Sequence, residues 1–245
     1  TGESRSRTSL DLPGRQQQLL EALHATGKPV ILVLINGQPL TVNWANAYIP
    51  AILESWFPGC QGGTVIAETL FGEHNPGGKL TVTFPKSVGQ IELNFPFKPG
   101  SHGSQPKSGP NGSGATRVIG ELYPFGFGLS YTTFEYGDLR PSATTLRRGE
   151  KVTVEVSVTN TGGMDGAETV HWFISDPVCR ISRPVRELKH FEKQPIRRGE
   201  TRTFRFEIDP EKDLSFTDDD GNRFLEPGDY FILVKDKKVK LTLTD

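Results

Sequence analysis

The stretch that decides the fold of the second half of the chain is VTVEVSV, residues 152–158. Its four valines alternate with polar residues, which is the pattern of a strand with one buried face. Shorter runs of the same kind follow at residues 167–174, 185–191, 203–208, 230–234 and 239–243. In the third of these, Phe204, Phe206 and Ile208 are expected to point inward. No helix is expected after Leu122, and about seven short strands separated by turns predict a β-sandwich.

The two cysteines narrow the kind of sandwich. Cys179 has no cysteine partner in the second half of the chain, because Cys60 lies in the first half. A disulfide-pinned immunoglobulin domain is therefore excluded, and a fibronectin type III-like sandwich is the better interpretation.

No metal or other cofactor is expected. The five histidines show no ligand spacing, and DDDGN at residues 218–222 lacks the acidic first ligand of a calcium loop, so it is predicted to be a hairpin turn. Residues 59–63 lack the Lys-Ser/Thr that completes a phosphate-binding loop, and residues 126–128 lack the third glycine of a dinucleotide-binding motif.

The first part of the chain alternates helices and strands, which predicts α/β architecture. The run VILVLI at residues 30–35 is apolar without alternation, as expected of a parallel strand covered on both faces. Asn36-Gly37 turns the chain. The other expected elements are helices at residues 15–25 and 61–71, a second apolar run at 51–57, and a third strand at 80–84.

Residues 96–120 are rich in Gly, Ser, Pro and Lys and offer almost no side chain to bury. A segment of this composition is predicted to be a long loop. The expected organisation is therefore an α/β domain over residues 1–95, a loop or linker over 96–128, and the fibronectin type III-like domain over 129–245.

The balance of charge excludes two classes of partner. A net charge of -1 without a basic run gives no reason to expect nucleic acid. No apolar stretch approaches the roughly 18–20 residues of a membrane-spanning helix, and no signal peptide is evident in the chain, which starts at Thr1. Neither nucleic acid nor a membrane is an expected partner.

Four motifs, taken in order, carry a resemblance to a known family. They are KPVILVLINGQP at 28–39, WFPG at 56–59 running into Gly62-Gly63, LFG at 70–72 with NPGGKL at 75–80 and Phe84-Pro85, and LYPFGFGLSYT at 122–132. In this order they resemble the C-terminal half of family 3 glycoside hydrolases, especially bacterial periplasmic β-glucosidases. Asn160-Thr-Gly162, Arg183-Pro184 and Glu226-Pro-Gly228 resemble the family's appended fibronectin-like domain.

The resemblance implies a three-domain enzyme made of a (β/α)8 barrel, an α/β sandwich and this fibronectin-like domain. Such enzymes remove terminal β-linked sugars with retention of configuration, so an oligosaccharide or a β-glucoside is the expected substrate. The nucleophile is an aspartate on the barrel, which is absent from this chain, and the chain alone is expected to be inactive. Periplasmic or secreted location is implied as well.

Glu3 is the candidate acid/base. In relatives this residue is usually a glutamate on a loop of the α/β domain, near the point where this chain begins, but relatives often carry two glutamates there. An upstream glutamate is therefore the alternative. Paired with Arg5 or Arg7, Glu3 would be a plain loop carboxylate with a lowered pKa, the wrong direction for a general acid.

Trp56 is the candidate sugar-binding residue, because it closes a strand of the sheet and can stack on a sugar ring. Packing in the core or at an interface is the alternative for Trp56, as for Trp44 and Trp172. A second function class also stays open, a non-catalytic carbohydrate-binding or adhesive module. Such a module has no need of an α/β half, and this favours the glycosidase.

Overall fold

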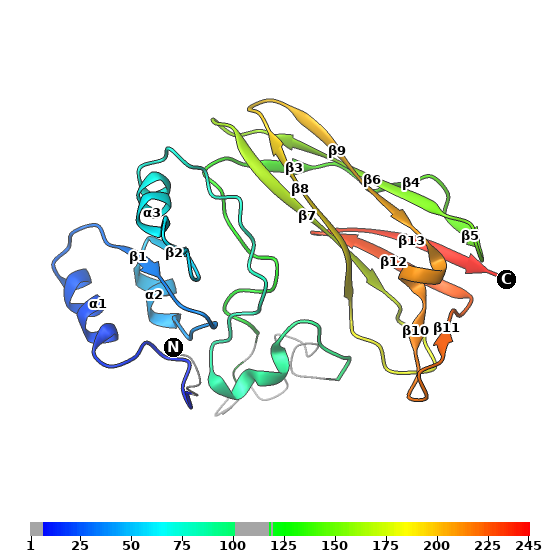
Figure 1. Cartoon of the computed structure of the whole chain (residues 1–245), viewed down its shortest axis with the longest axis horizontal. Helices are drawn as coiled ribbons and strands as arrows, with labels where there is room; N and C mark the ends of the chain where they lie inside the picture. Colours follow the sequence, from blue (N-terminus) through cyan, green and yellow to red (C-terminus); the bar gives the residue numbers. More distant parts are fainter. Residues whose placement is uncertain (1–6, 101–117, 119) are drawn as a thin grey trace. The chain divides into compact units, whose positions relative to one another are not determined.

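The computed structural model describes residues 7–100, 118 and 120–245. These fall into two compact units, each built from segments that are not continuous in sequence (Figure 1). The first unit comprises Thr1–His74, Leu80–Phe95 and Gly100–Phe127, and the second comprises Asn75–Lys79, Pro96–Pro99 and Gly128–Asp245. The domain boundaries expected from sequence at residues 95 and 128 stay a prediction.

The first unit is α/β, as predicted. Its two strands, β1 and β2, pair in parallel with Ile31 opposite Ala51 and Leu34 opposite Glu54. A small core forms where α1 and α2 pack on this pair, and it includes Leu20, Leu34, Leu40, Val42, Ala45 and Ile49. The elements are α1 (Gln16–Ala25), β1 (Ile31–Leu34), α2 (Asn43–Tyr48), β2 (Ala51–Glu54), α3 (Gly62–Leu70) and η1 (Val88–Leu93).

Two predictions for this unit are wrong. Residues 80–84 do not form a strand: the backbone N–H of Leu80 donates to the Phe127 carbonyl at 2.8 Å, and Phe84 makes only an isolated antiparallel bridge with Tyr123. The partner segment turns between these two contacts: the Phe127 N–H donates to the Pro124 carbonyl at 3.1 Å, and Gly126 has a φ of +81°, so a continuous ladder cannot form.

The strand at residues 30–35 is not covered on both faces by the described residues. Ile31 is 50% exposed and Ile35 is 60% exposed. A two-stranded sheet with few helices offers too little surface to bury every side chain of an apolar strand. The uniform apolar pattern therefore indicates a strand with more to bury than this unit covers.

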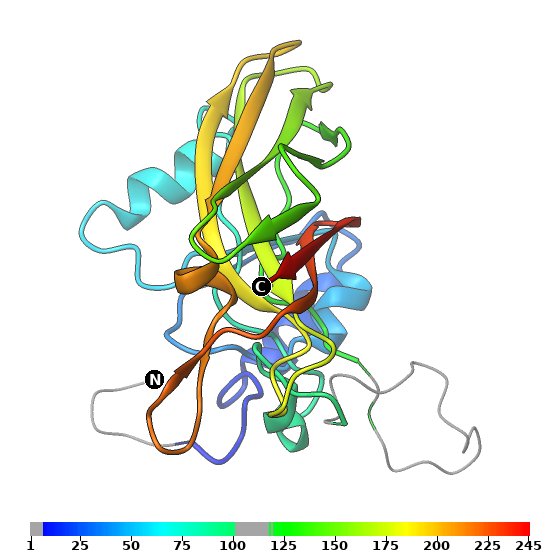
Figure 2. The same ribbon diagram turned by 90° about the vertical axis from the view of Figure 1, so that its right-hand side faces the viewer.

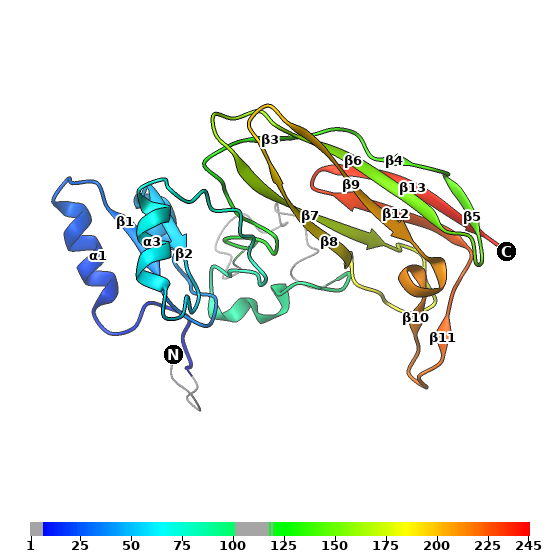
Figure 3. The same cartoon turned by 45° about the horizontal axis from the view of Figure 1, so that its top comes forward.

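The second unit is a β-sandwich, as predicted (Figures 2 and 3). One sheet has the order β5–β13–β12–β7–β8, and in the other β6 pairs with β9 along one edge and with β3 and β4 along the other. The strands are β3 (Phe134–Tyr136), β4 (Arg140–Pro141), β5 (Thr145–Arg147), β6 (Val152–Asn160), β7 (Gly166–Ser175), β8 (Glu187–Ile196), β9 (Thr201–Ile208), β10 (Phe216–Thr217), β11 (Arg223–Phe224), β12 (Gly228–Val234) and β13 (Lys237–Thr244).

Alternation explains the sandwich core. Every second residue of β6 is buried, and so are Phe204, Phe206 and Ile208 of β9, as predicted. Trp172 and Tyr230 fill the space between the sheets. A fully buried aromatic side chain of this size stabilises a domain by about 3–5 kcal/mol relative to alanine.

The expectation of no helix after Leu122 is wrong. Pro210–Leu214 forms one helical turn, η3, between β9 and β10. Asp209 starts the turn because its side chain accepts a hydrogen bond from the Glu211 N–H, and proline suits the first helical position. The hairpin predicted at 218–222 is confirmed: it joins β10 to β11, and it projects from the sandwich in Figures 1 and 3.

The NPGGK segment, Asn75–Lys79, belongs to the second unit and carries a buried ion pair. The Lys79 ammonium lies 3.3 Å from the Glu168 carboxylate, which is only 3% exposed, and it donates to the Gly128 carbonyl at 2.9 Å. The Tyr136 hydroxyl donates to the same carboxylate at 3.1 Å. Burial, and then the charge of Glu168, raise the pKa of Tyr136. The lysine of this motif therefore has a structural partner.

Gly77 is expected to tolerate no side chain. A Cβ built there would lie 2.6 Å from the Ala167 carbonyl oxygen, whereas a Cβ at Gly78 meets nothing within 4 Å. Gly77→Ala should lower the free energy of unfolding by about 1–3 kcal/mol, and the matched control Gly78→Ala should leave it nearly unchanged. Urea unfolding of the chain measures both. Equal effects of the two substitutions would contradict the close approach.

Candidate functional site

The carboxyl ends of β1 and β2 meet at one edge of the first unit, because the two strands are parallel and in register. The residues that follow them, 35–38 and 55–57, therefore lie close together. Ligand sites of open α/β sheets form at this edge. Trp56, the sugar-binding residue predicted from the sequence, also lies at this edge.

A polar cluster lies just inside this edge. Asn36 is almost fully buried and donates from Nδ2 to Oε2 of Glu54 at 3.1 Å. The backbone N–H of Trp56 donates to Oε1 of the same carboxylate at 2.9 Å. Burial raises the pKa of Glu54, against the lowering effect of these two hydrogen bonds. A carboxylate with fixed donors thus joins the two strand ends.

Trp56 adopts a backbone conformation that is rare for a bulky residue. Its φ is +50°, in the left-handed region, and such a conformation costs on the order of 1–3 kcal/mol and clusters at functional sites. The hydrogen bond to Glu54 holds it. The indole ring is partly exposed, and its centroid lies 5.9 Å from that of Phe84. The sugar-stacking role of Trp56 stays a prediction.

Phe57 is a neighbour that the sequence analysis missed. Its side chain is 69% exposed, and its ring covers Gly37, where a Cβ would lie 2.5 Å from the ring edge. A side chain at residue 37 would therefore displace the Phe57 ring from this position. Phe57 thus presents an exposed aromatic ring beside the carboxyl ends of the two strands.

Two buried polar atoms at this edge have no hydrogen-bond partner among the described residues. They are Nε2 of Gln38 and Oγ of Ser55. A buried polar group without a partner costs about 1–3 kcal/mol. Ser55 directly follows Glu54, and Gln38 lies two residues after Asn36, so these costs and the strained backbone of Trp56 fall on the same few residues.

Glu54→Gln is expected to change stability in a pH-dependent way. A carboxyl with a raised folded-state pKa binds its proton more tightly in the folded than in the unfolded chain, so its ionisation costs stability as pH rises above its ordinary value of 4.5. Relative to the unchanged chain, the glutamine variant should be more stable at pH 7 than at pH 4. Urea unfolding at the two pH values measures this difference. A difference that is equal at both, or larger at pH 4, would contradict it.

Glu3 lies outside the described residues, so its role as acid/base stays a prediction. Of the two arginines considered as its partners, Arg7 is described, and its Nη2 donates to the Asp11 carbonyl at 2.6 Å. The structure brings Trp56 to the carboxyl edge together with Asn36 and Glu54. Proximity of Asn36 to Glu54 could have been inferred only from the parallel register of the two strands.

Neither cysteine forms a disulfide, and no group of three His, Cys, Asp or Glu side chains that could hold a metal ion occurs within residues 7–100, 118 and 120–245. In the same part of the chain, no helix has the length and apolar character needed to cross a bilayer.

Comparison with known families decides the identity. Residues 1–131 match the glycosyl hydrolase family 3 C-terminal domain. The chain belongs to this family. Residues 168–238 match the fibronectin type III-like domain, in agreement with the sandwich of the second unit.

Relatives of this family 3 chain are named for glycosidase activities. It is 43% identical to a periplasmic beta-glucosidase of Salmonella typhimurium over 97% of its own length and 32% of that protein. It is 42% identical to a beta-xylosidase of Formosa agariphila, over 95% of the chain and 31% of that protein. The chain thus spans about a third of the length of these relatives.

Solved structures of β-glucosidases have the same fold over nearly the whole of this chain. A beta-glucosidase from Listeria innocua in complex with glucose superposes with a TM-score of 0.86 at 34% identity, covering 100% of this chain and 35% of that one. A beta-glucosidase from Kluyveromyces marxianus in complex with glucose gives a TM-score of 0.80 at 27% identity, with 98% and 29% covered.

Proposed function

We propose that this chain is the C-terminal part of a retaining exo-β-glycosidase of the β-glucosidase type. The observation that carries the proposal is the match of residues 1–131 to the family 3 C-terminal domain, in a chain that spans about a third of relatives named beta-glucosidase and beta-xylosidase. The relatives named here are glycosidases, which gives no support to a non-catalytic binding or adhesive module.

Retaining hydrolysis needs two carboxyl groups about 5–5.5 Å apart. One attacks the anomeric carbon to form a glycosyl-enzyme, and the other protonates the leaving oxygen and then activates water. In the proposed enzyme the attacking aspartate lies on an N-terminal (β/α)8 barrel, and Glu3 is the acid/base of this chain. A terminal β-linked glucose or xylose of an oligosaccharide or β-glucoside is the proposed substrate.

The carboxyl edge of the first unit contributes the substrate-shaping surface in this proposal. The strained Trp56, held by Glu54, and the exposed Phe57 support it, since aromatic faces bind sugar rings through apolar contact. Periplasmic or secreted location is proposed as well, with support from the name of the Salmonella relative.

The stereochemistry of hydrolysis tests the proposal. Proton NMR of the first sugar released from an aryl β-glucoside or aryl β-xyloside by the full polypeptide should show the β-anomer before mutarotation, because two inversions give retention. The α-anomer as first product would contradict a retaining enzyme.

A further inference from the structure

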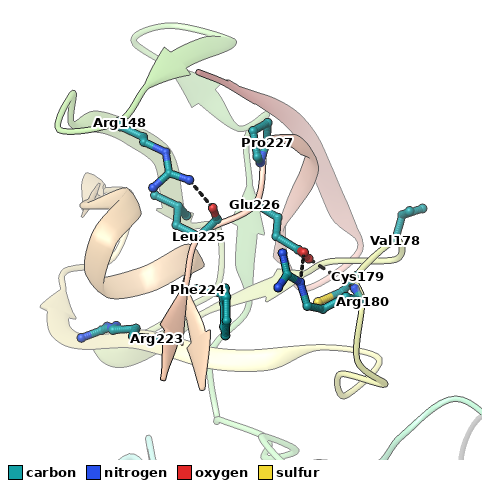
Figure 4. A pocket seen from close by; sticks show the side chains of 9 residues that line it. All are labelled: Arg148, Val178, Cys179, Arg180, Arg223, Phe224, Leu225, Glu226 and Pro227. Carbon is teal, nitrogen blue, oxygen red and sulfur yellow. Dashed lines mark hydrogen bonds and ion pairs between the residues drawn. The ribbon is translucent and has the colours of Figure 1, made fainter. Parts of the chain in front are cut away.

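A cleft of about 660 Å³ opens on the second unit beside the β10–β11 hairpin (Figure 4). Its lining comes from segments far apart in sequence, which the sandwich brings together: the turn after β5, the loop after β7, and the chain from β11 to β12. Its volume lies within the range of about 300–1,000 Å³ found for small-molecule sites. The lining residues are Arg148, Val178–Arg180 and Arg223–Pro227.

The lining carries an excess of positive charge. The lining contains three arginines, Arg148, Arg180 and Arg223, and one carboxylate, that of Glu226, so its formal charge is +2. Figure 4 shows the ion pair of Arg180 with Glu226 at one side of the cleft, and Arg148 reaching toward the backbone of Leu225 from another.

Neutral groups hold two of these guanidinium groups. Arg148 donates from Nη2 to the Leu225 carbonyl at 2.5 Å, and Arg223 donates to the Lys212 carbonyl at 3.0 Å and to the Ser215 hydroxyl at 2.6 Å. Among the described residues, neither forms an ion pair with an acidic side chain. Their charge is therefore held in position without being neutralised by a described carboxylate, and each keeps N–H groups that no acceptor in the described part of the chain uses.

The cleft also has an apolar side. The Arg180 guanidinium lies 4.3 Å from the centroid of the Phe224 ring, so the arginine is fixed by both the ring and Glu226. The Phe224 ring also stacks against Phe216, with centroids 5.9 Å apart, so Phe224 is held from both sides. The exposed side chains of Val178 and Pro227 supply the apolar surface beside the charged groups. A ligand that satisfies this lining combines a planar anionic group with a ring that has an apolar face.

We propose that this cleft binds a carboxylate-bearing saccharide. A planar carboxylate matches the fork of a guanidinium group, and the apolar side of a sugar ring matches the exposed side chains of Val178 and Pro227. The membership of the chain in a glycosidase family makes saccharides the relevant ring-bearing ligands. The site lies in the second unit alone, so it goes beyond the proposed hydrolysis and stands or falls separately from it.

Isothermal titration of the 245-residue chain with trigalacturonate tests the proposal. Saturable binding with a Kd below about 1 mM at low salt is expected, weaker as salt is raised, and absent for uncharged cellotriose. Arg148→Gln should weaken binding about tenfold, the loss of one charge-assisted contact. The matched control is Arg205→Gln, which removes an arginine that pairs with Glu155 on the outer surface, and it should leave the affinity unchanged.

A second variant should raise the affinity for trigalacturonate, a result that loss of folding cannot produce. Glu226→Gln removes the one negative charge of the lining while keeping its shape, so trigalacturonate should bind severalfold more tightly. Absence of saturable binding, equal effects of Arg148→Gln and Arg205→Gln, or no gain with Glu226→Gln would each overturn the proposal. Inorganic phosphate that binds as tightly as trigalacturonate and displaces it would also overturn it, since the cleft would then recognise a bare oxyanion.

Discussion

Arg183→Met is expected to lower the free energy of unfolding by about 3–5 kcal/mol, the cost of breaking a buried ion pair from one side. Arg183 is 4% exposed, and its Nη1 donates to Oδ2 of Asp176 at 3.0 Å and to the Leu214 carbonyl at 2.8 Å. Its Nε donates to Glu187 at 2.9 Å. Methionine keeps the packing of the stem but leaves the Asp176 carboxylate, 5% exposed, without its cation.

Urea unfolding of the chain measures this loss, and two further variants locate its cause. Asp176→Asn in the Arg183→Met background should recover part of the stability, because burial already raises the pKa of Asp176 and an amide carries no charge to bury. The control Arg205→Met breaks an exposed pair with Glu155 and should cost far less. Equal losses from Arg183→Met and Arg205→Met would refute a structural role for the buried arginine.

Glu3→Gln in the full polypeptide is expected to lower kcat on a β-glucoside with a poor leaving group by about 10²–10⁴-fold, the usual contribution of general acid–base catalysis. The amide can neither protonate the leaving oxygen nor activate water. On an aryl glucoside with a good leaving group the loss should be smaller, and azide should restore turnover, because an anionic nucleophile needs no general base.

Glu73→Gln is the matched control for this prediction, since Glu73 is an exposed carboxylate of the same unit. It should keep full activity. A Glu3→Gln enzyme with unchanged kcat on every substrate would transfer the acid/base role to a glutamate upstream of this chain, while leaving the rest of the proposed function intact.

The alternation of apolar and polar residues correctly predicted the strands of the sandwich whose inner face is buried. The valines of residues 152–158 alternate because β6 has one buried face, and the strand appeared where expected. Residues 80–84 alternate in the same way but form no strand, because a strand also needs an extended partner, and the segment beside it turns at residues 124–127. Alternation is thus a necessary sign of a half-buried strand and not a sufficient one.

The features of the candidate site were less accessible from sequence. Trp56 was chosen for its position at a strand end, but its positive φ depends on a hydrogen bond to Glu54 that only the folded backbone defines. The pair of Lys79 with Glu168 joins residues 89 positions apart, and no local signal indicates such a contact. The family motif around Lys79 could be recognised from the sequence, but the ion pair that gives its lysine a structural role could not.

Turnover by the chain alone, compared with turnover by the full polypeptide, tests the central claim most directly. Without the nucleophile proposed to lie on the barrel, no glycosyl-enzyme can form, so residues 1–245 should hydrolyse an aryl β-glucoside or β-xyloside no faster than background. The full polypeptide should turn over at least one of the two substrates. Activity that stays with the purified 245-residue chain through repurification, or a folded full polypeptide that cleaves neither substrate, would contradict the account.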